Sequence, residues 1–171
     1  MNVKFAIGFS AVCLYAFLTI GPAAQQTVAA QQNMTSDMRH TAKGSFDVKA
    51  TPTQNASAES PFSERILDKQ YHGDLEGSAK GQMLAWGTGA KGSTGVYIAL
   101  EQVTGTLQGR KGTFVLQHSG SMLNGVPQLD VKVVPGSGTD QLAGIGGSMN
   151  IIIAPDGKHS YEFQYTLAPA P

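Results

Sequence analysis

From about residue 40 onward, apolar and polar residues alternate along short segments that turn residues separate. The clearest segment is HSYEFQYTL at 159–167, where aromatic and aliphatic side chains take every second position after His159. A period of two places these side chains on one face of a β-strand and the polar ones on the other. The pattern predicts a sheet with a buried face, and it shows no helical period.

Strand-like segments recur at nearly regular spacing, with turn residues between them. Glycine-containing turns at 109–112, 124–125 and 155–157 join consecutive segments. Short sequential connections favour an antiparallel meander, and about eight such strands can close into a barrel. We therefore predict an all-β fold, an eight-stranded antiparallel closed β-barrel, with a two-sheet sandwich as the alternative. The predicted strands cover residues 45–49, 65–72, 74–86, 95–107, 112–122, 128–134, 148–154 and 159–167.

The N-terminus has the pattern of a secretory signal peptide. Lys4 precedes an uncharged apolar run at 5–20, and small residues follow up to Ala30, where we predict cleavage. Cleavage after Ala24 and retention of the run as an anchor remain alternatives. The predicted location is exported, either periplasmic or secreted. The predicted organisation is a signal peptide at 1–30, a flexible segment at 31–41, a barrel domain at 42–168 and a tail at 169–171.

The composition excludes several classes of function. Twelve basic residues balance twelve acidic ones, which removes the positive charge expected of a nucleic-acid binder or a cationic membrane face. The single cysteine, Cys13, lies in the apolar run of the signal peptide. We therefore expect the mature chain to have no thiol chemistry, no nucleic-acid partner and no membrane contact after cleavage.

The glycine-rich stretch VVPGSGTDQLAGIGG at 133–147 resembles a phosphate-binding loop only superficially. It has no lysine to meet a phosphate, and Asp140 would repel one. A predicted strand precedes it, and a β-branched strand rather than a helix follows. The stretch is therefore predicted to join strand to strand.

Two predicted strands are apolar on both faces, at 96–103 and 149–153. A strand of this kind needs cover on the outside of a barrel as well as on the inside. A subunit interface would supply that cover, so we predict a homo-oligomer.

Several motifs together resemble a bacterial family, the domain-of-unknown-function family 3224. They are HGDLEG, VTGTLQGRKGTFVLQHSG, VVPGSGTDQLAGIGG and HSYEFQYTL, in matching order and spacing over about residues 41–167. The resemblance implies the fold of the allene oxide cyclase barrel, whose members form trimers and cyclise a fatty-acid epoxide. The family itself has no established activity, and fold alone does not imply the reaction. The exported N-terminus departs from the family pattern, and it puts a cytoplasmic metabolic role in doubt.

The sequence gives little support for metal binding or for nucleophilic catalysis. The four histidines are far apart, so no ligand pair is evident, and we predict neither a metal nor a cofactor. His118 and Ser119 are neighbours on a predicted strand, so their side chains point to opposite faces. His118 is therefore not expected to activate Ser119.

Buried acid–base groups are the remaining candidates. His118 shares a strand face with Phe114 and Leu116, either as a hydrogen-bonded core residue or as a base. Glu101 lies in an apolar strand, and if it points inward, burial would raise its pKa and make it a proton donor or polar anchor. A salt bridge or an exposed position is the alternative for Glu101.

Further candidates line predicted strand faces. Glu76 shares a face with His72 and Asp74, at a barrel mouth or on a solvated surface. Tyr161 and Tyr165 belong to an aromatic face, which in a barrel is both core and pocket wall. The candidate ligand-binding residues are thus Glu76, Glu101, His118, Tyr161 and Tyr165, with Glu101 and His118 as catalytic candidates.

Three functions remain open. The first is binding of a small apolar or amphipathic molecule inside the barrel. The second is a cofactor-independent isomerase or cyclase, in which Glu101 or His118 moves a proton. The third is a structural or assembly module with a filled barrel. A binder or enzyme would need an internal cavity of a few hundred Å³.

Overall fold

The computed structural model describes residues 39–53, 60–88 and 92–167, and these ranges contain a single sheet of eight strands. The predicted signal peptide and tail lie outside the described residues. The strands are β1 (Arg39–Pro52), β2 (Phe62–Gly73), β3 (Leu75–Gly87), β4 (Gly95–Leu107), β5 (Arg110–Leu123), β6 (Val126–Val133), β7 (Gly146–Ile153) and β8 (His159–Thr166).

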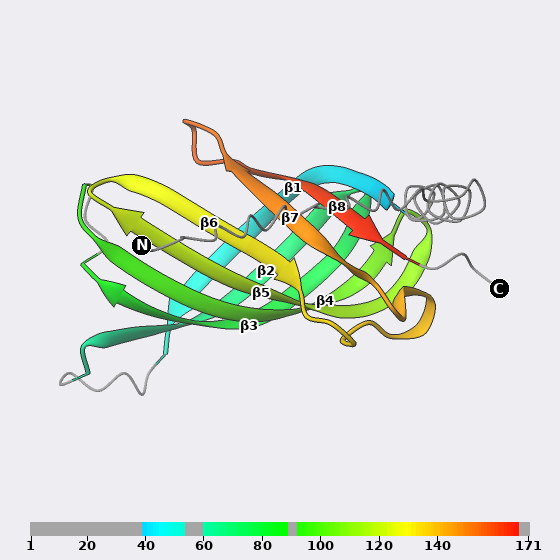
Figure 1. The fold of residues 1–171 in the computed structure, drawn as a ribbon, viewed down its shortest axis with the longest axis horizontal. Coiled ribbons are helices and arrows are strands. Elements are labelled where there is room, and N and C mark those ends of the chain that lie inside the picture. Colours follow the sequence, from blue (N-terminus) through cyan, green and yellow to red (C-terminus); the bar gives the residue numbers. More distant parts are fainter. Residues whose placement is uncertain (1–38, 54–59, 89–91, 168–171) are drawn as a thin grey trace, which may run out of the picture. The chain divides into compact units, whose positions relative to one another are not determined.

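The sheet closes on itself as a barrel (Figure 1). Each strand pairs antiparallel with the next strand in the sequence, and β8 pairs with β1. The predicted closed meander is confirmed, and the sandwich alternative is wrong. Pairing is extensive between β4 and β5, from Gly95 opposite Met122 to Leu107 opposite Arg110. Between β6 and β7 the described register is the single pair of Lys132 and Ser148.

One half of the barrel interior is filled with large side chains. Phe163 stacks on Phe114 and Tyr165, with ring centroids 5.8 and 5.2 Å apart. Leu75 and Leu107 are fully buried beside them. These residues alternate with polar ones along their strands, because every second side chain points inward. We call this region the filled half.

The glycine-rich stretch joins β6 to β7, as predicted, and it also packs on the filled half. Its centre forms a short 3-10 helix, Asp140–Leu142, which is too short to produce a sequence period. Leu142 and Ile145 are buried. Gly138 allows this packing, because a Cβ at that position would collide with the carbonyl oxygen of Leu142. The stretch therefore contributes to the core.

At the other end of the barrel, inward-facing side chains reach solvent. Val48, Met122 and Leu129 lie on inward-facing positions of β1, β5 and β6, yet they are 37–42% exposed. Tyr97 on β4 is half-buried at the same end. We call these four residues the mouth.

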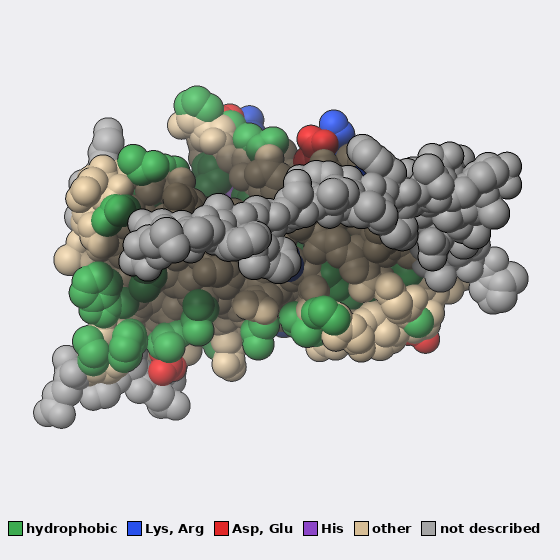
Figure 2. All heavy atoms as spheres, in the orientation of Figure 1, with side chains coloured by type: hydrophobic (Ala, Val, Ile, Leu, Met, Phe, Trp, Pro, Cys, Tyr) green, Lys and Arg blue, Asp and Glu red, His purple; other side chains and the backbone are tan. Residues whose placement is uncertain are grey.

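The outside of β2, β3 and β4 carries many large apolar side chains. We define this outer apolar face by Phe62, Ile66, Leu84, Trp86, Val96, Ile98 and Leu100, which are 36–61% exposed. Figure 2 shows hydrophobic side chains gathered along the margin of the molecule where β3 and β4 run. On β4, Ala99, Glu101 and Val103 point inward, so Glu101 takes the inward orientation that the sequence left open.

Among the described residues, no helix is long and apolar enough to cross a membrane.

Candidate functional site

Four polar side chains meet inside the barrel, between the filled half and the mouth. They are Lys69 and Tyr71 from β2, Glu101 from β4 and His118 from β5, and each is at most 5% exposed. On β4, Glu101 lies two inward-facing positions deeper than Tyr97 of the mouth. On β5, His118 lies two such positions deeper than Met122. We call these four residues the buried polar cluster.

Glu101 is the centre of the cluster. Its Oε1 accepts a hydrogen bond of 2.6 Å from the Tyr71 hydroxyl. Its Oε2 lies 2.7 Å from the Lys69 Nζ, an ion pair with both side chains out of solvent. The Nε2 of His118 lies 3.6 Å from Oε1, which is beyond ordinary hydrogen-bond length. Three groups from two other strands therefore surround one carboxylate.

Lys69 is held by aromatic rings as well as by charge. Its Nζ lies 4.7 Å from the centre of the Phe46 ring and 5.8 Å from the centre of the Tyr71 ring. The electron-rich ring face attracts a cation, more strongly where water is excluded. The ammonium group is thus positioned from both sides, by Glu101 and by these rings.

The charge state of Glu101 follows from its neighbours. Burial by itself raises the pKa of a carboxyl, but His118 and Lys69 outweigh this effect and lower the pKa of Glu101 from 4.5 to about 2. The expectation that burial would raise this pKa was therefore wrong, because it left out His118 and Lys69, and the salt-bridge alternative for Glu101 applies. At neutral pH Glu101 is a fixed anion, so it cannot act as a proton donor.

Two tyrosines near the carboxylate stay protonated. Burial raises the pKa of Tyr71 well above 10, and the charge of Glu101 raises it further. Burial and the same charge also raise the pKa of Tyr97. Both phenols are consequently neutral over the physiological range.

His118 has an unsatisfied nitrogen. Its Nε2 is buried and has no hydrogen-bond partner among the described residues. Between His118 and the mouth, β5 carries Gly120, and the ring of Tyr97 occupies the space that a Cβ at Gly120 would fill. The Tyr97 ring therefore covers the route from the mouth to His118.

The structure brings together two of the five predicted site residues, Glu101 and His118. Tyr161 lies next to the cluster, with its ring 5.7 Å from that of Tyr71, and its hydroxyl accepts a hydrogen bond from the Leu75 amide. Tyr165 lies in the filled half, where its hydroxyl donates to Gln108. Both tyrosines are therefore core residues whose hydroxyl groups are hydrogen-bonded within the protein.

The fifth predicted residue, Glu76, lies outside the barrel. Its side chain is 61% exposed, and it accepts a hydrogen bond from the Gly73 amide in the turn between β2 and β3. Its Oε2 is 3.9 Å from His72, which is also exposed. The solvated-surface alternative applies to this residue, because it points away from the interior.

Sequence reasoning missed Lys69 and Tyr71. A signal was present, because Leu67, Lys69 and Tyr71 take alternate positions on one strand. A lysine between two apolar residues at this spacing must either be buried with a partner or interrupt the apolar face. Its partner Glu101 is 32 residues away in the sequence, so the pairing becomes visible only when β2 and β4 are both placed.

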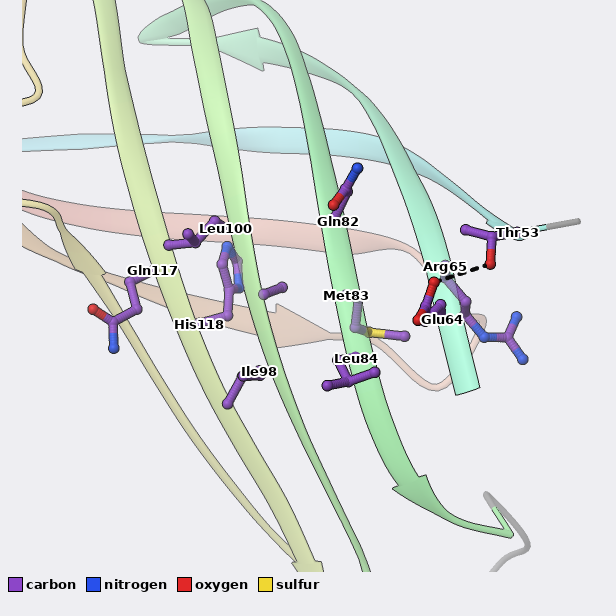
Figure 3. Close-up of a pocket in the computed structure, with 11 residues that line it drawn as sticks. Thr53, Glu64, Arg65, Gln82, Met83, Leu84, Ile98, Leu100, Gln117 and His118 are labelled. Atoms are coloured by element: carbon purple, nitrogen blue, oxygen red, sulfur yellow. Dashed lines mark hydrogen bonds between the residues drawn. The ribbon is translucent and has the colours of Figure 1, made fainter. Parts of the chain in front are cut away.

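A hollow of about 620 Å³ lies on the outside of the barrel (Figure 3). Arg65, Met83, Ala99 and His118 form one inward-facing row across four paired strands. The hollow touches this row and the outward-facing rows on both sides of it, so it is a groove whose floor is the strand backbone. Its lining residues are Thr53, Glu64, Arg65, Gln82, Met83, Leu84, Ile98, Ala99, Leu100, Gln117 and His118.

This groove is therefore distinct from the internal cavity that the sequence-based binding hypothesis needs. Its side-chain walls include Leu84, Ile98 and Leu100 of the outer apolar face. Among the described residues, no group of three or more His, Cys, Asp or Glu side chains is arranged to hold a metal ion.

Eight antiparallel strands in meander order, closed around an ionised cluster, define a small β-barrel with a polar centre. The chain belongs to the family described as protein of unknown function DUF3224, whose model matches residues 42–165. A crystal structure of a DUF3224 protein of unknown function from Shewanella oneidensis is 42% identical, with a TM-score of 0.68. The match covers 77% of this chain and 99% of that one. A comparison with curated proteins finds no match.

Proposed function

We propose that the barrel binds a small apolar or amphipathic molecule, which enters at the mouth and places its polar group against His118. One observation carries the proposal: the buried Nε2 of His118 has no hydrogen-bond partner among the described residues. An unpaired buried polar atom costs about 1–3 kcal/mol. A ligand that supplies the missing partner recovers this free energy.

The ion pair next to His118 supports the same proposal. Burying two charges costs several kcal/mol per ion, and an apolar pair of similar volume is often as stable. If stability were the only role of Lys69 and Glu101, two apolar side chains of similar volume would serve as well. Perturbed ionisable groups inside a fold are more typical of functional sites.

The mouth supplies the apolar contacts. Val48, Met122 and Leu129 point inward but remain more than a third exposed. A ligand that covers them gains about 25 cal/mol per Å² of apolar surface removed from water. The Tyr97 ring must swing away from Gly120 for the ligand to reach His118.

The test is native mass spectrometry of the exported protein, followed by denaturation and analysis of released small molecules. We expect a stoichiometric small molecule on the wild type, lost in His118→Leu and retained in His72→Ala. His72 is an exposed histidine on the outside, which makes it a matched control. Bare protein mass with nothing released, together with no uptake of added amphiphiles, would instead favour a structural module with a filled barrel.

The cofactor-independent isomerase is the second candidate, and His118 carries it. Because Glu101 is a fixed anion at neutral pH, it cannot supply a proton, and His118 is the remaining member of the two catalytic candidates. A carboxylate beside an imidazole orients the ring. Turnover of a released ligand by the wild type, and its loss in His118→Ala, would establish the enzyme.

We also propose export, on the basis of the N-terminal pattern of Lys4, the apolar run and the small residues up to Ala30. N-terminal sequencing of the protein recovered outside the cytoplasm tests it. A start at Gln31 agrees with cleavage after Ala30, and a start at Gln25 with cleavage after Ala24. An intact Met1 on the recovered protein contradicts cleavage.

A second copy of the chain is the proposed partner of the outer apolar face. The seven side chains expose on the order of several hundred Å² of apolar surface, more than an isolated protein usually leaves uncovered. The formal net charge is zero, and it becomes only −1 when Lys4 is removed with the predicted signal peptide, so two copies repel each other little. Sedimentation of the wild type and of Ile98→Lys tests the proposal. We expect the wild type to be an oligomer and Ile98→Lys to be a monomer. A monomeric wild type would contradict the proposal.

A further inference from the structure

We infer that the polar group bound at His118 is an uncharged hydroxyl, so that the ligand is an alcohol or phenol with an apolar body. The inference rests on the proposed function and names its ligand class. It follows from the charges of the buried polar cluster and from the donors and acceptors that the cluster leaves available.

The ion pair at the centre of the cluster is already electrically balanced. Lys69 and Glu101 form an ion pair at 2.7 Å, and the neighbouring phenols of Tyr71 and Tyr97 are neutral. An anionic ligand would lie against the carboxylate of Glu101, and a cationic one against the ammonium of Lys69. Either ligand would also lose its hydration on entering the barrel. A neutral polar group avoids both costs.

The geometry around Glu101 and His118 favours a group that both donates and accepts. The Nε2 of His118 and the Oε1 of Glu101 are 3.6 Å apart, too far for a good mutual hydrogen bond. The carboxylate favours the tautomer with a proton on Nε2, because that nitrogen faces it. A hydroxyl oxygen can accept from Nε2–H while its own proton is donated to the carboxylate.

Charged head groups, ketones and esters satisfy only one side of this arrangement. A carboxylate accepts but has no proton to donate, and an ammonium donates but cannot accept. A ketone or ester oxygen would satisfy His118 alone. Of these groups, the hydroxyl alone meets both the unpaired imidazole and the anion beside it, through a single oxygen atom.

Arg65 provides the competing explanation. It lies on the inward-facing row, closer to the mouth than Lys69, and is half-buried. A carboxylate ligand could pair with its guanidinium at the rim and place its apolar body deeper in the barrel. In that arrangement the acid would bind more tightly than the alcohol, and Arg65→Met would abolish the difference.

A matched series of eight-carbon ligands separates these outcomes. Octan-1-ol and octylammonium have the same octyl chain, and octanoate has the same eight carbons with one of them in its carboxylate, so calorimetric titration at pH 7 compares the head groups. We expect the alcohol to bind at least about tenfold more tightly than either ion, as the loss of one buried hydrogen bond predicts. In His118→Leu this preference should disappear, while His72→Ala should retain it.

A spectroscopic readout shows whether His118 itself meets the ligand. The ¹⁵N resonances of the His118 side chain should shift on addition of octan-1-ol, and those of the exposed His72 should not. Equal or tighter binding of octanoate or octylammonium overturns the hydroxyl assignment and leaves ligand binding intact. If no member of the series binds and no small molecule is released from the native protein, both the function and this assignment fail.

Discussion

The filled half and the mouth are built from the same strands, yet they differ in what the inward positions hold. On β5, Phe114 and Leu116 are fully buried in the filled half, whereas Met122 is 37% exposed at the mouth. On β2, Tyr71 is fully buried and Arg65 is half-buried. Packing therefore declines along β2 and β5 toward the mouth.

The buried polar cluster lies where this change occurs. Apolar packing on one side excludes water from Glu101 and strengthens its interactions with Lys69 and His118. On the other side, the small residues Ala99 and Gly120 separate the cluster from the mouth. The filled half thus supplies stability and holds the cluster, and the mouth lies beyond the small residues.

The largest expected difference between the two halves comes from paired truncations. Phe163→Ala removes a fully buried ring from the filled half and should cost about 3–5 kcal/mol of unfolding free energy. Met122→Ala at the mouth should cost less than about 1 kcal/mol, because its side chain already reaches solvent. Urea denaturation measures both, and similar losses would show that the mouth is packed as tightly as the filled half.

The cluster should behave as a unit. Glu101→Leu leaves the Lys69 ammonium buried without its anion and should destabilise the fold by about 3–5 kcal/mol. The double variant Lys69→Met, Glu101→Leu should recover most of that loss. Asp130→Ala, which breaks an exposed pair with Lys132, is the control and should cost less than about 1 kcal/mol. Additive losses in the double variant would argue against a coupled pair.

Stability should depend on pH through Glu101. Its pKa is lowered from 4.5 to about 2 on folding, so its contribution is fully present above pH 4.5 and is lost as the pH falls toward 2. The shift corresponds to about 3 kcal/mol, on the order of one buried pair. Unfolding free energies between pH 6 and pH 2 test this, and Glu101→Gln should flatten the slope. An unchanged slope in that variant would assign the acid sensitivity to other carboxyls.

The smallest effect on the unfolding free energy should come from moving the Tyr97 ring, which covers the route to His118. Gly120→Ala forces the Tyr97 ring to move, because the new Cβ would occupy its place, and it should cost about 1 kcal/mol. The displaced ring should open the route to His118 and speed release of the proposed ligand. In the Tyr97→Ala background, Gly120→Ala should lower the unfolding free energy hardly at all, because no ring has to move. Equal costs in both backgrounds would show that the ring does not rest on Gly120.

The sequence alone was sufficient for the architecture. The period of two in segments such as 159–167, and the glycine turns between strands, predicted the closed meander that the structure shows. The glycine-rich stretch was correctly predicted to connect strands. Its buried residues Leu142 and Ile145 were not predicted, because a single 3-10 turn has no sequence period.

Only the tertiary structure decided the chemistry of the site. Glu101 and His118 were candidates because of their strand faces. The sequence around these two residues did not indicate that Lys69 would lie beside them. That meeting depends on the register of three strands and on closure of the barrel. The direction of the Glu101 pKa shift depends on it too, since burial and a nearby cation act in opposite senses. Local periodicity specifies which face a side chain takes, whereas its partners are specified by residues distant in the chain.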